Sequence, residues 1–133
     1  MSQLQLALDG DQVAFEPGAE LRLTATWDLD RPASQIELRL FWYTQGKGDS
    51  DVYVVQKLPF LHPELRDSKR LAIRLPDGPY SFSGKLISLI WGLELVAQGS
   101  KEAARLEFLM APGGEEIVLE EVETKKSAFR FTS

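Results

Sequence analysis

LPDGPYSFSGKLISLIWGLELVA, residues 75–97, is the stretch of sequence that decides the fold. It opens with the turn cluster Pro76-Asp77-Gly78-Pro79, which the interior of a helix or strand would not tolerate. In its second half, apolar side chains recur at every second position and would share one face of a β-strand: Ile87, Leu89, Trp91, Leu93, Leu95 and Ala97. The stretch therefore predicts a turn followed by a long central strand with one buried face and a second, partly covered face.

A buried helix is the alternative for a run of this hydrophobicity. Gly84 and Gly92 lie within the run, as do the β-branched residues Ile87 and Ile90. Glycine inside a strand usually marks a bulge, a bend or the close approach of another segment. Together with the strict alternation, these residues favour a strand.

The same alternation continues outward from the central stretch. Toward the N-terminus it predicts strands over residues 4–8, 20–29, 35–43 and 71–75, and a short strand over 52–55. Polar and glycine-bearing loops separate these segments. The upstream half of the chain is therefore expected to be built from short strands.

Two further regions need separate treatment. Residues 57–68 contain Pro59 and Pro63 and are expected to be irregular, because proline interrupts the hydrogen-bond ladder of a sheet. Downstream of the central strand, Leu106 and Phe108 predict another core strand.

The C-terminal region is less decisive. Residues 116–119 follow a Gly-Gly turn, which favours a strand, although the neighbouring Glu120 and Glu121 favour a helix. Residues 124–133 are basic and aromatic, and we expect this tail to be poorly ordered unless one of its phenylalanines docks. The sequence thus predicts a single domain over residues 1–123 followed by a tail.

Seven to eight short strands with turn signals between them, and no convincing long helix, predict an all-β fold. The expected architecture is an immunoglobulin-like antiparallel β-sandwich. The three tryptophans, Trp27, Trp42 and Trp91, fall in the apolar registers of predicted strands. Large aromatic side chains contribute most to a core, so all three are expected to be mostly buried.

Two segments carry a resemblance to a known family. Leu75-Pro76, the turn, Tyr80-Ser-Phe-Ser-Gly84 and Trp91-Gly-Leu-Glu-Leu-Val96 resemble the signature of arrestin-like domains, and Phe15-Glu-Pro-Gly-Ala-Glu-Leu21 resembles the segment that leads into the family's second strand. The resemblance implies a sandwich without a catalytic site that binds other proteins, as in the arrestins and sporulation-control-type proteins. The best-known members carry two such domains in tandem, whereas this chain has room for one.

Composition narrows the function classes. The chain has 133 residues, 20 acidic against 15 basic, and a formal net charge of −5, which disfavours a general role on nucleic acid. It has no cysteine, so disulfides and thiolate metal sites are excluded. The N-terminal residues have no basic region followed by an apolar run, and no apolar stretch is long enough to cross a membrane. We expect a cytoplasmic protein without a signal peptide or a transmembrane segment.

Catalytic and metal sites are not indicated. His62, the one histidine, lies in a proline-bearing loop without a companion His or Cys at metal-ligand spacing. The aspartates near predicted strand ends and in the glycine-bearing loop lack the remaining residues of a calcium loop and are typical of turns and caps. They are Asp9, Asp11, Asp28 and Asp30 near strand ends, and Asp49 and Asp51 in the loop. We expect no catalytic residue, no cofactor and no metal.

The candidate partner-binding residues are Phe41, Tyr43, Tyr53, Val54 and Val55. In the predicted registers the aromatic members of this set face away from the core and could form an exposed surface. The strand from Asp51 to Gln56 lacks proline and, if it lies at a sheet edge, could accept a strand from a partner or from a second copy of the chain.

Two alternatives stay open at this point. The segment 57–68 could fold over the aromatic residues and cap the edge. The chain could also be a carbohydrate- or small-ligand-binding sandwich that uses Phe41, Tyr43 and Tyr53 as a stacking platform. The function that the sequence favours is a non-catalytic adaptor or scaffold domain.

Overall fold

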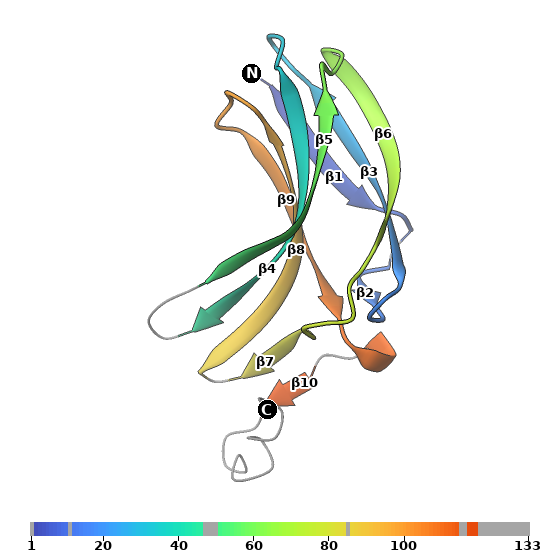
Figure 1. Ribbon diagram of the computed structural model, residues 1–133, viewed down its shortest axis with the longest axis vertical. Helices are drawn as coiled ribbons and strands as arrows, with labels where there is room; N and C mark the ends of the chain where they lie inside the picture. Colours follow the sequence, from blue (N-terminus) through green and yellow to red (C-terminus); the bar gives the residue numbers. More distant parts are fainter. Residues whose placement is uncertain (1, 11, 47–50, 85, 115–116, 120–133) are drawn as a thin grey trace.

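The computed structural model describes residues 2–10, 12–46, 51–84, 86–114 and 117–119. These residues form ten β-strands and one short 3-10 helix (Figure 1). Seven strands have six residues or more: β1 (Gln3–Leu8), β3 (Glu20–Asp28), β4 (Gln35–Gly46), β5 (Val52–Leu61), β6 (Arg66–Arg74), β8 (Ile87–Ala97) and β9 (Ala103–Met110). The remaining elements are short: β2 (Ala14–Phe15), β7 (Phe82–Gly84), η1 (Pro112–Gly114) and β10 (Ile117–Leu119).

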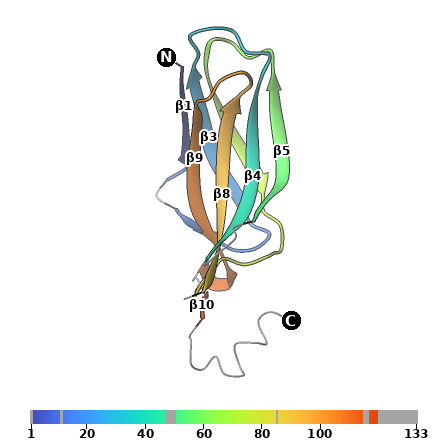
Figure 2. The ribbon, with the colours of Figure 1, turned by 90° about the vertical axis from the view of Figure 1, so that its left-hand side faces the viewer.

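The strands form two sheets. The smaller is antiparallel, in the order β1-β3-β6, and the larger has the order β10-β7-β8-β4-β5, with β9 paired to β8 on one side and to β2 on the other. Figure 2 shows β9, β8, β4 and β5 side by side in front of the smaller sheet. In Figure 1 the two sheets face each other in the upper half, and the end of β4 and the starts of β5 and β8 then bend away from β3 and β6.

The hydrophobic core lies between the two sheets. Its members come from alternate positions of the long strands, as the period of two requires. The largest side chains with almost no exposed surface are Trp27, Trp91, Leu21, Leu23, Ile36, Leu38, Leu40, Leu75, Leu93, Leu95 and Met110. Both buried indoles also have hydrogen-bond partners: Nε1 of Trp27 donates to the Glu64 carbonyl at 2.9 Å, and Nε1 of Trp91 donates to the Pro79 carbonyl at 2.8 Å.

The two segments that carry the arrestin-like resemblance lie against each other. The backbone N–H of Gly18 donates to the carbonyl of Pro76 at 3.1 Å, and the N–H of Leu75 donates to the carbonyl of Ala19 at 2.8 Å. Gly18 has a φ of 78°, a conformation that favours glycine. The two turns, more than fifty residues apart in the sequence, are therefore joined by backbone hydrogen bonds at one end of the sandwich.

The central strand forms as predicted. In β8 the side chains of Leu89, Trp91, Leu93, Leu95 and Ala97 are buried. Ile87, at the start of the same register, is 42% exposed because the larger sheet has there bent away from the smaller one (Figure 1).

All three tryptophans are mostly buried, as predicted, but to different degrees. Trp27 and Trp91 are 1% and 0% exposed, whereas Trp42 is partly buried and packs against the core. Its ring stacks on Tyr53 with centroids 4.2 Å apart.

The prediction that residues 57–68 are irregular is wrong. β5 continues through Pro59 to Leu61, and β6 begins at Arg66. Proline is tolerated there because β5 is the last strand of its sheet, so the missing N–H of Pro59 can face away from β4. The tail over residues 124–133 lies outside the described residues.

Candidate protein-interaction edge

β5 ends the larger sheet and, within the described part of the chain, pairs with β4 alone. Its pairing with β4 follows from the sequence, because two apolar strands joined by a polar, glycine-bearing loop form an antiparallel hairpin. The side of β5 that faces away from β4 is thus the open side of the sheet. We call residues 52–56 on that side the β5 edge.

The hydrogen bonds of the hairpin fix which backbone groups face outward. The N–H of Thr44 donates to the carbonyl of Asp51 at 2.9 Å, so the backbone of Asp51 faces β4. In an antiparallel pair the backbone direction alternates from residue to residue. Tyr53 therefore also faces β4, while the N–H and carbonyl groups of Val52 and Val54 face away from it.

The other half of β5 cannot extend this open edge. The N–H of His62 donates to the carbonyl of Ser34 at 3.0 Å, so the backbone of His62 faces β4. Because the backbone direction alternates along the strand, the backbone of Leu58 also faces β4 and that of Pro59 faces away from it. Pro59 has no N–H, and proline on an outward position is a common way of blocking edge pairing. The backbone groups available for pairing are therefore confined to the β5 edge.

A β-bulge separates the two halves. Leu40 is opposite Gln56 and Phe41 is opposite Val54, which leaves Val55 as an extra residue. A one-residue insertion of this kind moves every following side chain to the other face of the strand. The bulge explains why simple alternation along β5 places Tyr53 on the wrong face.

The sequence-predicted aromatic residues consequently lie on two faces. Tyr53 is opposite Trp42 on the core-facing side of the sheet, and Phe41 and Tyr43 lie on the outer side with their rings stacked at 6.1 Å. A single stacking platform of Phe41, Tyr43 and Tyr53 does not form.

The outer aromatic pair is covered by β9, not by residues 57–68. The guanidinium of Arg105 lies 4.6 Å from the ring centre of Phe41 and 5.3 Å from that of Tyr43. Phe41 is 3% exposed and packs over Gly92, and the hydroxyl of Tyr43 donates to Glu107 at 2.7 Å. Partial burial and the Glu107 carboxylate raise the pKa of Tyr43 above its usual value. The sequence analysis does not predict that β9 covers these two rings. The available signal is that Arg105 and Glu107 alternate with the core residues Leu106 and Phe108 and so lie on the outer face of the strand.

The β5 edge is apolar and exposed. Val52 is 60% exposed, Tyr53 is 49% exposed, and Val54 and Val55 are each 45% exposed. No charged residue occurs from Val52 to Gln56. The edge therefore combines unpaired backbone groups with uncharged side chains, a combination that natural proteins usually avoid at an edge that is not used.

β6, one of the two edge strands of the smaller sheet, is in contrast protected by charge. Arg66, Arg70 and Arg74 lie on its outer face, and Asp67 and Lys69 form an ion pair at 3.5 Å on the other face. Charged side chains on an edge strand oppose the addition of another strand. Of these two edges, β5 alone is open to pairing.

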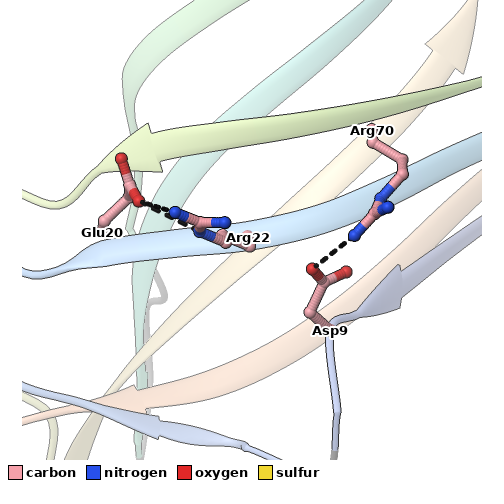
Figure 3. Close-up of polar contacts among 4 residues, drawn as sticks. All are labelled: Asp9, Glu20, Arg22 and Arg70. Carbon is pink, nitrogen blue, oxygen red and sulfur yellow. Dashed lines mark hydrogen bonds and ion pairs between the residues drawn. The ribbon is translucent and has the colours of Figure 1, made fainter.

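Three of the four arginines on the outer face of the smaller sheet are paired with carboxylates, and the fourth, Arg74, donates to the Gly18 carbonyl at 3.0 Å. Figure 3 shows Arg22 bound to Glu20 at 3.0 Å and Arg70 bound to Asp9 at 3.4 Å. Arg66 is bound to Asp28 at 3.0 Å. Carboxylates interrupt the arginines, so this outer face does not form a continuous basic patch of the kind that binds nucleic acid.

The other residues considered from the sequence do not gather into a site. His62 is exposed, and the hydroxyl of Ser2 donates to Asp30 at 2.8 Å, which lowers the pKa of that carboxyl group. Among the described residues, no three His, Cys, Asp or Glu side chains are arranged to hold a metal ion. Asp11 and Asp49 lie outside the described residues. In the described part of the chain, no helix has the length and apolarity needed to cross a membrane.

Comparison with known proteins bears on the fold. No family model and no curated protein matches the chain. Among solved structures, the sporulation control protein Spo0M from Bacillus subtilis aligns with a TM-score of 0.57 and 16% sequence identity, over 83% of this chain and 49% of that chain. A β-glucosidase from Listeria innocua aligns over 87% of this chain and 16% of that chain, with 11% identity and a TM-score of 0.46, too weak a likeness to bear on either fold or function.

The likeness to Spo0M confirms the arrestin-like fold that the sequence motifs predict. This chain spans about half the length of the Spo0M structure.

Proposed function

We propose that this arrestin-like domain is a non-catalytic protein-binding module that takes up an extended segment of a partner as an added strand on the β5 edge. The observation that carries the proposal is the outward-facing backbone of Val52 and Val54 on an exposed, uncharged strand. In strand addition, main-chain hydrogen bonds provide affinity and alternate side chains provide specificity.

The faces beside the edge define the partner segment. On the core-facing side the added strand would lie next to the Tyr53–Trp42 stack, and on the outer side next to Val52 and Val54. Apolar side chains suit both faces, so the expected partner is an extended segment with apolar residues on each side and no proline.

A displayed library of random peptides, selected against the wild-type domain, supplies a probe for this proposal. The Val54→Pro variant removes an outward N–H, and we expect it to weaken binding of the selected peptides by about ten-fold or more. The matched control is Val54→Thr, which keeps the N–H and the β-branched shape and should bind within about three-fold of the wild type.

Equal binding by wild type and a folded Val54→Pro protein, measured by fluorescence anisotropy, would show that the β5 edge is not the site. Retention of the wild-type circular dichroism spectrum establishes that the variant is folded.

A further inference from the structure

We infer that a second copy of this chain can occupy the β5 edge, paired antiparallel about a two-fold axis that passes between the two Tyr53 residues. The inference rests on the β5 edge as the binding site proposed above and specifies one occupant for it. Four features of the edge support it: its symmetry, its charge, its side-chain contacts and its position in the fold.

The sequence of the edge is self-complementary. Val52-Tyr53-Val54 reads the same in both directions. In an antiparallel pair centred on Tyr53, each Val52 lies opposite Val54 of the second copy. Because the N–H and carbonyl groups of both valines face outward, these opposed residues can exchange hydrogen bonds in both directions.

Charge also favours this register. The chain has a formal net charge of −5, so two copies repel each other, and an uncharged contact surface adds no local repulsion to this. In the register centred on Tyr53, Asp51 lies opposite Val55 of the second copy and not opposite another aspartate. β6 offers no such contact, because pairing two β6 strands would bring arginines from both copies together.

The side chains of the two copies would also be in contact. The two Tyr53 residues form a pair that is not hydrogen-bonded, in which the Cα atoms are about 4.5 Å apart and the side chains are close. Each Tyr53 already stacks on its own Trp42, with ring centres 4.2 Å apart. Pairing would therefore extend the aromatic stack across the two-fold axis.

The position of the edge in the fold also favours pairing. In Figure 1 the start of β5 lies on the part of the hairpin that bends away from β3 and β6. An added strand would continue the order β8-β4-β5 into a second β5 and β4, which makes one sheet across both copies. Pro59 limits the pairing to the β5 edge, so we expect a weak, concentration-dependent dimer.

Single cysteines test the two-fold register directly, because the chain has no cysteine of its own. Tyr53→Cys places two thiols opposite each other, and under mild oxidation it should form a disulfide-linked dimer at least about ten-fold faster than Val52→Cys or Val54→Cys alone. A mixture of Val52→Cys protein with affinity-tagged Val54→Cys protein should form the mixed dimer in preference to either self-linked dimer.

Equal rates for all three single variants, or a monomer mass for the wild type at every concentration tested by light scattering, would overturn the inference. If Tyr53→Cys fails to cross-link while wild-type protein still binds the selected peptides, self-pairing is wrong and the proposed function stands. If the cross-link forms while no peptide is selected, self-pairing stands and capture of a foreign segment is wrong.

Discussion

At the scale of the residue, Gly92 sets the outer surface of the larger sheet. A Cβ atom at this position would lie 2.6 Å from Cζ of Phe41 and 3.0 Å from the carbonyl oxygen of Leu106. Contacts this short are not tolerated, so the absence of a side chain at Gly92 is what lets Phe41 lie flat and buried under Arg105. The glycine that interrupts the predicted central strand thus marks a close approach, one of the alternatives expected from the sequence.

Gly92→Ala should destabilise the domain by about 1–3 kcal/mol, because the added methyl group displaces the Phe41 ring and crowds the backbone of β9. The measurement is urea denaturation, in which the transition midpoint should fall while its slope stays unchanged. A midpoint equal to that of the wild type would contradict the packing described here.

The double variant Gly92→Ala, Phe41→Leu serves as the control. Replacing the ring relieves one of the two short contacts, so the double variant should be less destabilised than the sum of the single variants, by about 1 kcal/mol.

At the scale of the element, β5 has two unlike halves joined by the bulge at Val55. The half that ends at Leu61 has Pro59 on its outward side, while the half that begins at Val52 has an open backbone and exposed apolar side chains. The bulge turns Tyr53 to the core-facing side, against Trp42. One strand therefore contains both a blocked and an open stretch of sheet edge.

A pair of proline substitutions tests this assignment of backbone direction. Val54→Pro removes an N–H that faces solvent and should leave the hairpin hydrogen bonds intact, whereas Gln56→Pro removes an N–H that faces β4. Gln56→Pro should therefore lower the unfolding free energy by about 1 kcal/mol more than Val54→Pro does. Equal losses in the two variants, measured by urea denaturation, would mean that the outward and inward positions have been assigned wrongly.

The sequence predicts the long strands well and the edge strand poorly, for physical reasons. β3, β4 and β8 each bury one face, and burial on one face produces the alternation from which a strand is predicted. β5 is exposed on both faces over most of its length, so its pattern carries little information. Whether a strand can include Pro59, and whether Val55 forms a bulge, depends on which strand pairs with β5. The local sequence does not specify that pairing.

Part of the candidate site can likewise be predicted from the sequence and part cannot. The sequence suggests an edge at Val54 and Val55 on the condition that the strand ends a sheet, and the structure places it there. For Phe41 and Tyr43 the sequence leaves open whether they are exposed or covered, and the structure shows them covered from β9. The cover comes from Arg105, far away in the sequence, and strand order decides that contact.

At the scale of the whole molecule, the β5 edge lies outside the hydrophobic core, to which none of residues 52–56 belongs. The sandwich buries its core between two sheets, protects β6 with charge and covers the outer aromatic pair with Arg105. β5 is the last strand of the larger sheet, and its first residues lie where that sheet bends away from the smaller one (Figure 1). A partner strand added there would widen the larger sheet without disturbing the core. Such an addition suits a binding function that needs no catalytic group.

Amide hydrogen exchange by nuclear magnetic resonance tests the central claim most directly. In dilute protein the amides of Val52 and Val54 should exchange rapidly, while that of Tyr53, which faces β4, should be protected. At high concentration, or with a selected peptide, the two valine amides should become protected as well. Slow exchange at Val52 and Val54 in the dilute monomer, or rapid exchange that neither concentration nor peptide alters, would contradict an open binding edge on β5.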